Sequence, residues 1–178
     1  YLKHQAYFGL SLGITGFLIG YLIRYQHWKK FALPLLILNF IALALVFTHI
    51  GLATGNANRW LKIGPLSFQP AESMKLAFII YLAAWLSNPK IKRTTKFFEG
   101  FLPFALISGL IAILLVLQPA TSTVAILLGS GLVVYVLDGA KIRYISLIIL
   151  VGILGVATLV LITPYRKDRV LGFFNKTE

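Results

Sequence analysis

The chain has 178 residues, of which 58% are hydrophobic and 12% are charged. Soluble domains carry roughly 25% charged residues, and a fold this small cannot bury so much apolar surface in one core. The composition therefore excludes an ordinary soluble domain and predicts an all-α integral membrane protein, a polytopic bundle of transmembrane helices. The absence of cysteine excludes a disulfide framework, an iron–sulfur cluster and a thiol nucleophile.

In chain order, six apolar segments are predicted to form membrane helices, which together make a single transmembrane domain over residues 1–178. They cover about 6–23, 31–50, 71–87, 101–117, 122–137 and 144–163. A spanning helix needs ~20 apolar residues, so the third and fifth segments are short. Pro70 and Pro119 stand near the starts of these two segments and suit a first helical position, where the missing N–H is not needed.

The net charge of +12 is compatible with nucleic acid, but the positions of the basic residues favour lipid. Nucleic-acid binding requires a basic surface interleaved with aromatic residues, and the sequence shows none, so no nucleic-acid partner is expected. The basic residues fall mainly in alternate short loops, which the positive-inside rule places on the cytoplasmic side. They are Arg24, Lys29, Lys30, Lys90, Lys92, Arg93, Lys96, Lys141 and Arg143.

Two patterns within the apolar segments indicate close helix packing. Gly9, Gly13, Gly16 and Gly20 fall on one stripe of the first segment, and such stripes let membrane helices approach closely. Asn39 interrupts an apolar run and is predicted to form an interhelical hydrogen bond. We interpret both patterns as structural features and not as binding sites.

The segment 51–76 carries the main candidate site, because it has too many bends and charges for a simple turn. Arg59 lies within it, and Gln69 precedes a helix on which Glu72 and Lys75 share one face. Ionisable residues in an apolar helix are costly unless they pair or face a cavity, and arginine suits phosphate geometry. Together they predict a site for an anionic headgroup. Alternatively, Glu72 and Lys75 form a purely structural pair, and Arg59 extends to the membrane interface.

Two further polar stretches lie on the same predicted outer side. Residues 118–123 (QPATST) hold hydroxyl groups that are expected to cap the next helix. Residues 164–169 (PYRKDR) contain Arg166 and Arg169, which we interpret either as part of a solvated loop or as further phosphate contacts.

The stretch 58–76, NRWLKIGPLSFQPAESMKL, resembles the signature of the SEDS family (shape, elongation, division and sporulation), whose best-known members are FtsW and RodA. The resemblance continues in order through 117–119 (LQP) and 164–166 (PYR). The second of these favours the FtsW branch. The matching residues of the signature are Arg59, Trp60, Gly64, Phe68, Gln69, Pro70, Glu72 and Lys75.

The resemblance implies a fold, an activity and partners. The chain would cover the second to seventh of ten family helices in the bacterial cytoplasmic (inner) membrane. The family polymerises lipid II, a disaccharide-peptide on undecaprenyl pyrophosphate, into glycan strands at the outer face during cell division or elongation. Its partners are a class B penicillin-binding protein and other division or elongation proteins. The implied function is a peptidoglycan glycosyltransferase, with substrate-binding residues Arg59, Gln69, Glu72, Lys75, Arg166 and Arg169.

Two departures from the family pattern affect the expected activity. Ala120 stands where the family usually has an Asp after Gln-Pro. The family's essential Asp lies in a loop beyond the position of Glu178, so no catalytic residue is expected in this chain, and these residues alone are expected to be inactive. Two alternatives remain open: a flippase for a lipid-linked precursor, and a non-catalytic scaffold for a transpeptidase.

No cofactor is visible in the sequence. A pyrophosphate leaving group makes Mg²⁺ or Mn²⁺ chemically reasonable in the full protein, because a divalent cation neutralises the charge that develops. The few acidic residues form no cluster along the chain, and the histidines His4, His27 and His49 are far apart, so no metal ligand is predicted here.

Overall fold

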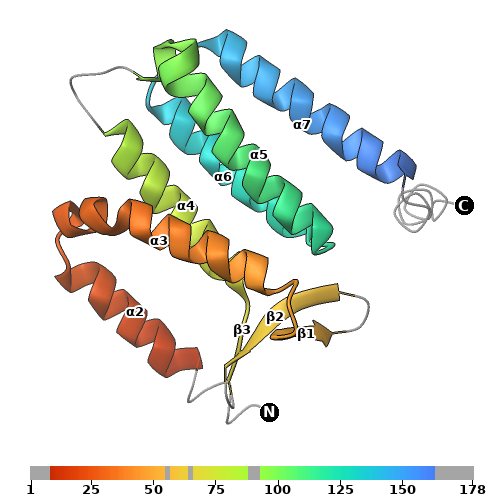
Figure 1. The fold of residues 1–178 in the computed structure, drawn as a ribbon. Coiled ribbons are helices and arrows are strands. Elements are labelled where there is room, and N and C mark those ends of the chain that lie inside the picture. Colours follow the sequence, from red (N-terminus) through yellow and green to blue (C-terminus); the bar gives the residue numbers. More distant parts are fainter. Residues whose placement is uncertain (1–8, 55–56, 64–65, 88–92, 163–178) are drawn as a thin grey trace, which may run out of the picture.

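The fold is known from a computed structural model, which describes residues 9–54, 57–63, 66–87 and 93–162. Long helices dominate it, and three short strands follow the second of them (Figure 1). The helices are α2 (Leu10–Leu22), α3 (Tyr25–Leu45), α4 (Pro70–Leu86), α5 (Leu102–Leu117), α6 (Thr121–Leu137) and α7 (Ile142–Ile162). The strands are β1 (Gly51–Thr54), β2 (Ala57–Ile63) and β3 (Leu66–Phe68).

The observed helices fall on the apolar segments, with one clear difference in boundaries. The helix expected at 31–50 begins at Tyr25 and ends at Leu45, so that boundary prediction was wrong at both ends. Its first turns include the basic pair Lys29 and Lys30, because a helix continues through polar residues once they lie beyond the apolar layer. Among the residues that the structure describes, the helical stretches Tyr25–Leu45 and Phe97–Leu117 are long and apolar enough to cross a membrane.

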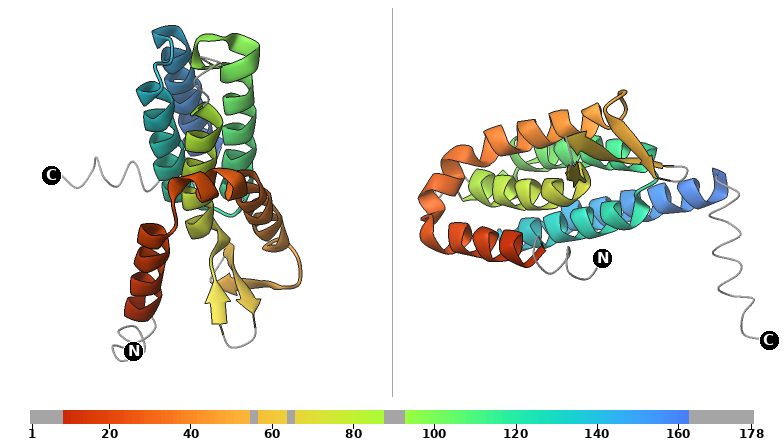
Figure 2. Two further views of the ribbon diagram at one scale, coloured as in Figure 1. Left: turned by 90° about the vertical axis from the view of Figure 1, so that its left-hand side faces the viewer. Right: turned by 90° about the horizontal axis from the view of Figure 1, so that it is seen from below.

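The centre of the molecule is a bundle of α3, α4, α5 and α6 (Figures 1 and 2). Phe78, Ile111 and Tyr135 are fully buried between these helices. Gly131 of α6 lies against α4 so closely that a Cβ there would be 2.5 Å from Phe78 Cε1. The predicted interhelical hydrogen bond of Asn39 is confirmed, because the Ser73 hydroxyl of α4 donates to the Asn39 side-chain oxygen.

The helices α2 and α7 leave most of their surface uncovered. Phe17 in α2 is 72% exposed and Ile153 in α7 is 62% exposed, which is a surface suited to lipid and not to water. α7 reaches the core through Tyr144 and Ile148 near its start. A Cβ added at any of the glycines of the α2 stripe would have no neighbour within 4 Å in the described chain. The close helix packing expected there is therefore not seen in this part of the chain.

A three-stranded antiparallel sheet, which the sequence analysis did not predict, lies at one end of the bundle (Figure 1). Its central strand is β2, whose Leu61 pairs with Gly51 of β1 and with Phe68 of β3. Side chains alternate along a strand, so Arg59 shares a face with the buried Leu61, while the exposed Lys62 lies on the opposite face. We call this region the sheet end: the sheet, the start of α4 and the turn between α5 and α6.

The opposite end, which we call the basic end, comprises the α2–α3 joint, residues 93–101 and the α6–α7 turn. Residues Phe97–Phe101 form a turn of π-helix before α5, in which the N–H of Phe101 donates to the Lys96 carbonyl. Gly100 permits this turn, because a Cβ there would lie 1.9 Å from the Arg93 carbonyl oxygen. The buried Thr94 hydroxyl lies 3.1 Å from Asp138 Oδ2, which ties this segment to the end of α6.

Candidate functional site at the sheet end

Arg59 of β2 binds the turn between α5 and α6. Its Nε donates a 3.0 Å hydrogen bond to the carbonyl oxygen of Gln118, and one terminal nitrogen donates to the carbonyl oxygen of Pro119. The last carbonyls of a helix have no partner within the helix, so the guanidinium supplies the missing donors. Arg59 therefore has a structural role that the sequence did not reveal, and only its remaining N–H groups are available to an anion.

Gln118 joins the same turn to α3. Its side chain is almost fully buried, and its Nε2 donates a 3.0 Å hydrogen bond to the Leu43 carbonyl. Its Oε1 is buried without a partner in the structure. Arg59 and Gln118 thus connect β2, the α5–α6 turn and the end of α3 into one polar layer at the sheet end.

Glu72 and Lys75 lie at the start of α4, directly after the sheet. Lys75 Nζ lies 2.8 Å from Glu72 Oε2, and their side chains are 25% and 57% exposed respectively, so the ion pair expected from the spacing is present. Glu72 lies in the first turn of the helix, where the helix dipole favours a negative charge. Gln69 is the half-buried N-cap residue, and its carbonyl accepts the N–H of Glu72.

Two local expectations for the α5–α6 turn were wrong. Pro119 is not the first residue of a helix, because α6 begins at Thr121 with Ala120 as its N-cap. The hydroxyls of 121–123 do not cap the helix, since no side-chain capping bond forms there. Ala120 is only 5% exposed, so the position where the related signature carries Asp is closed off by its surroundings.

The structure does not describe the other two predicted substrate-binding residues. Arg166 and Arg169 lie outside the described residues. Among the residues that the structure describes, no group of three or more histidine, aspartate or glutamate side chains is placed to hold a metal ion. The candidate site in the described chain therefore consists of Arg59, Gln69, Glu72 and Lys75.

A bundle of apolar helices with large side chains facing outward, and with a polar layer at one end, is the architecture of a polytopic membrane protein. The chain belongs to the FtsW/RodA/SpoVE family: the family model, described as a cell cycle protein, matches residues 1–178. The resemblance to the SEDS family is thereby confirmed, and with it the transmembrane helical bundle.

Individual relatives agree with this family. The chain is 32% identical over 175 residues to the probable peptidoglycan glycosyltransferase FtsW of Aromatoleum aromaticum, covering 98% of this chain and 42% of the relative. It is 31% identical over 179 residues to the stage V sporulation protein E of Bacillus subtilis, covering 100% of this chain and 48% of the relative. The chain thus spans less than half the length of these two relatives.

Solved structures match the fold as well. The rod shape determining protein RodA of Thermus thermophilus superimposes with a TM-score of 0.71 at 30% identity, covering 88% of this chain and 49% of that protein. A structure described as "Structural coordination of polymerization and crosslinking by a peptidoglycan synthase complex" matches with a TM-score of 0.67 at 30% identity. It covers 96% of this chain and 50% of the matched chain.

Proposed function

We propose that the protein is a peptidoglycan glycosyltransferase that polymerises lipid II at the outer face of the bacterial cytoplasmic membrane. The observation that carries this proposal is the match of the whole chain to one family, several members of which are named peptidoglycan glycosyltransferases. The polar layer at the sheet end supports it. A glycosyl transfer from lipid II releases a lipid pyrophosphate, and this leaving group needs cationic stabilisation.

Lys75 is the described residue best suited to that task. Its side chain is a quarter exposed, so the ammonium group is held near the surface of the bundle and not sealed inside it. Glu72, one turn earlier, fixes its position through the ion pair. The ammonium has three donors, so it can keep the carboxylate and still bind a phosphate oxygen. Arg166 and Arg169 are proposed to add further positive charge.

The Lys75 proposal is tested by polymerisation of lipid II in detergent with the intact gene product. Lys75→Ala is expected to lower the rate of glycan synthesis about 100-fold or more, because one charge-stabilising group is removed. Lys96 provides a matched control, since it forms an i,i+3 ion pair with Glu99 at 2.9 Å at the basic end. Lys96→Ala should leave synthesis unchanged.

A charge exchange distinguishes a functional role of the Glu72–Lys75 ion pair from a purely structural one. The exchange Glu72→Lys with Lys75→Glu restores opposite charges but places a cation at the N-terminus of α4, so it should restore part of the melting temperature lost in Lys75→Ala and none of the rate. Equal rates for Lys75→Ala and Lys96→Ala would contradict the role of Lys75. A rate that recovers in the exchanged variant would show that the pair serves only the fold.

The two other candidate functions give different results with the same protein. A flippase moves the precursor across sealed vesicles and makes no polymer in detergent. A scaffold co-purifies with a transpeptidase but forms no glycan. We propose a class B penicillin-binding protein as partner, which the similarity to a chain of a peptidoglycan synthase complex supports. Long glycan strands from lipid II in detergent would exclude both alternatives.

A further inference from the structure

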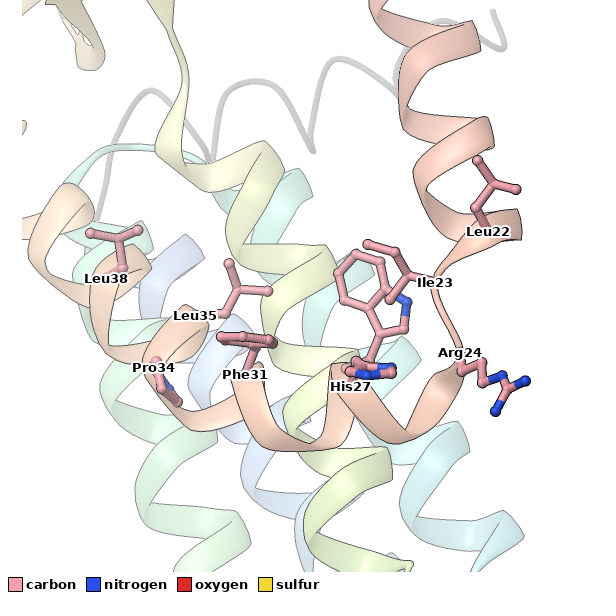
Figure 3. A pocket seen from close by; sticks show the side chains of 9 residues that line it. Leu22, Ile23, Arg24, His27, Phe31, Pro34, Leu35 and Leu38 are labelled. Carbon is pink, nitrogen blue, oxygen red and sulfur yellow. The ribbon is translucent and has the colours of Figure 1, made fainter.

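The joint between α2 and α3 holds an apolar groove that the proposed function does not use. α2 ends at Leu22, and the two helices diverge from the joint with a groove of about 700 Å³ between them (Figure 3). Ligand pockets typically have volumes of ~300–1,000 Å³. The apolar lining comes mainly from α3, which contributes Trp28, Phe31, Pro34, Leu35 and Leu38, and is completed by Leu22 at the end of α2 and by Ile23 in the joint.

One end of the groove is cationic. Arg24 and His27 line it there, and in Figure 3 the Arg24 guanidinium points away from the apolar side chains. Lys29 and Lys30 follow in the first turns of α3, and both are exposed. The sequence contains no acidic residue before Glu72. In the described part of the chain, the salt bridges are Lys75–Glu72 and Lys96–Glu99, so none neutralises this joint.

This arrangement is complementary to an amphipathic anion. An acyl chain would lie along the leucine and phenylalanine side chains, and a phosphate would lie at the level of Arg24. A second transmembrane helix fits the groove less well, because helix interfaces favour small residues and the lining side chains are large. A helix would also leave the cationic end without a counter-charge.

We infer that the α2–α3 groove binds a phospholipid with an anionic headgroup. This lipid would come from the membrane leaflet that surrounds the basic end. Basic residues near an anionic membrane surface each contribute ~1 kcal/mol, which corresponds to about a fivefold change in affinity. The site lies at the opposite end of the bundle from the sheet end. The inference therefore does not depend on the proposed glycosyltransferase function.

The test is native mass spectrometry of the intact gene product in detergent, with added phosphatidylglycerol or phosphatidylcholine. Phosphatidylglycerol is expected to bind more tightly, and Arg24→Gln should weaken its binding about fivefold. Lys141→Gln is the matched control, because this exposed residue carries the same charge at the same end of the bundle but does not line the groove.

A second pair of variants tests the apolar wall without changing any charge. Leu35→Trp fills the groove and should lower the binding of both lipids, whereas Leu33→Trp lies on an exposed part of α3 outside the groove and should not. Equal affinity for the two lipids, or unchanged binding in Arg24→Gln and Leu35→Trp, would overturn the inference. It would also be overturned if Leu35→Trp only converted a dimer to a monomer, because a second copy would then be the occupant.

Discussion

The Nε of Arg59 donates a 3.0 Å hydrogen bond to the carbonyl oxygen of Gln118, which lies 59 positions away in the sequence. This contact fastens β2 to the turn between two helices of the bundle. Gln118 in turn donates to Leu43, so the sheet end is held by a chain of polar contacts and not by apolar packing alone. The contribution of each contact to stability can be measured.

Arg59→Ala and Arg59→Lys are both expected to lower the stability of the protein. Each variant removes the paired hydrogen bonds to the α5–α6 turn, and hydrogen bonds to charged groups are worth ~1.5–3 kcal/mol each when well shielded. Arg59 is half-buried, so we expect a total loss of ~1–3 kcal/mol. The loss should appear as a lower melting temperature in a thermal unfolding experiment in detergent.

Lys62→Ala is the control for Arg59, because Lys62 lies on the opposite, exposed face of the same strand. Its melting temperature should equal that of the wild type. If Arg59→Lys were as stable as the wild type, the positive charge alone would matter, and the hydrogen bonds to Gln118 and Pro119 would not hold the turn.

Substitutions of Gln118 should lower the stability of the protein by different amounts. Gln118→Leu removes the donor to the Leu43 carbonyl but also removes the buried Oε1 that has no partner, so we expect a loss of only ~1 kcal/mol. Gln118→Glu places a carboxylate in the same buried position beside a carbonyl oxygen, and a buried unpaired charge costs several kcal/mol. At neutral pH, Gln118→Leu should therefore have a higher melting temperature than Gln118→Glu. The reverse order would show that water reaches this side chain.

The contact between Ser73 and Asn39 joins α4 to α3, and a double-mutant cycle measures it. Interhelical hydrogen bonds in membranes contribute ~0.6–2 kcal/mol. Ser73→Ala and Asn39→Leu should each destabilise the protein, and the double variant should cost less than the sum, because each single change already breaks the bond. Strict additivity of the two changes in unfolding free energy would mean that the contact contributes nothing.

Gly131 and Gly129 make a matched pair in α6. A Cβ at Gly131 would lie 2.5 Å from Phe78 Cε1, whereas a Cβ at Gly129 meets no described atom within 4 Å. Gly131→Ala should therefore destabilise the protein by ~1–3 kcal/mol through overpacking. Gly129→Ala should be neutral or stabilising by up to ~1 kcal/mol, since alanine favours the helix. Equal melting temperatures would show that Phe78 moves aside without cost.

The helical part of the fold was predictable from the sequence, because burial in lipid requires long apolar runs. The boundaries of α3 were not, since a helix extends past its apolar stretch through residues such as Lys29 and Lys30. The sheet was missed because Gly55, Gly64 and Pro65 indicate bends, and the short strands between them carry too few residues for a clear alternating pattern.

The site was predictable only where its contacts are local. The Glu72–Lys75 pair follows from a spacing of three on one helix, and the structure contains it. The partners of Arg59 are backbone carbonyls in a distant turn, and every residue type has such a carbonyl. No sequence pattern marks an acceptor of that kind, so the structural role of Arg59 required the fold to be known.

The π-helical turn at Phe97–Phe101 has a consequence for insertions and deletions. Each residue of an α-helix advances the chain by about 100°, so the length of this turn decides which side of α5 meets the bundle. Removing one residue there would swing Ser108, Ile111 and Gln118 away from their present neighbours. An insertion of one residue in the α6–α7 turn, by contrast, would displace the start of α7, where Tyr144 and Ile148 contact the core, and would leave the packing of α3, α4, α5 and α6 in place. A change of length should therefore be tolerated better in the α6–α7 turn than in the π-helical turn.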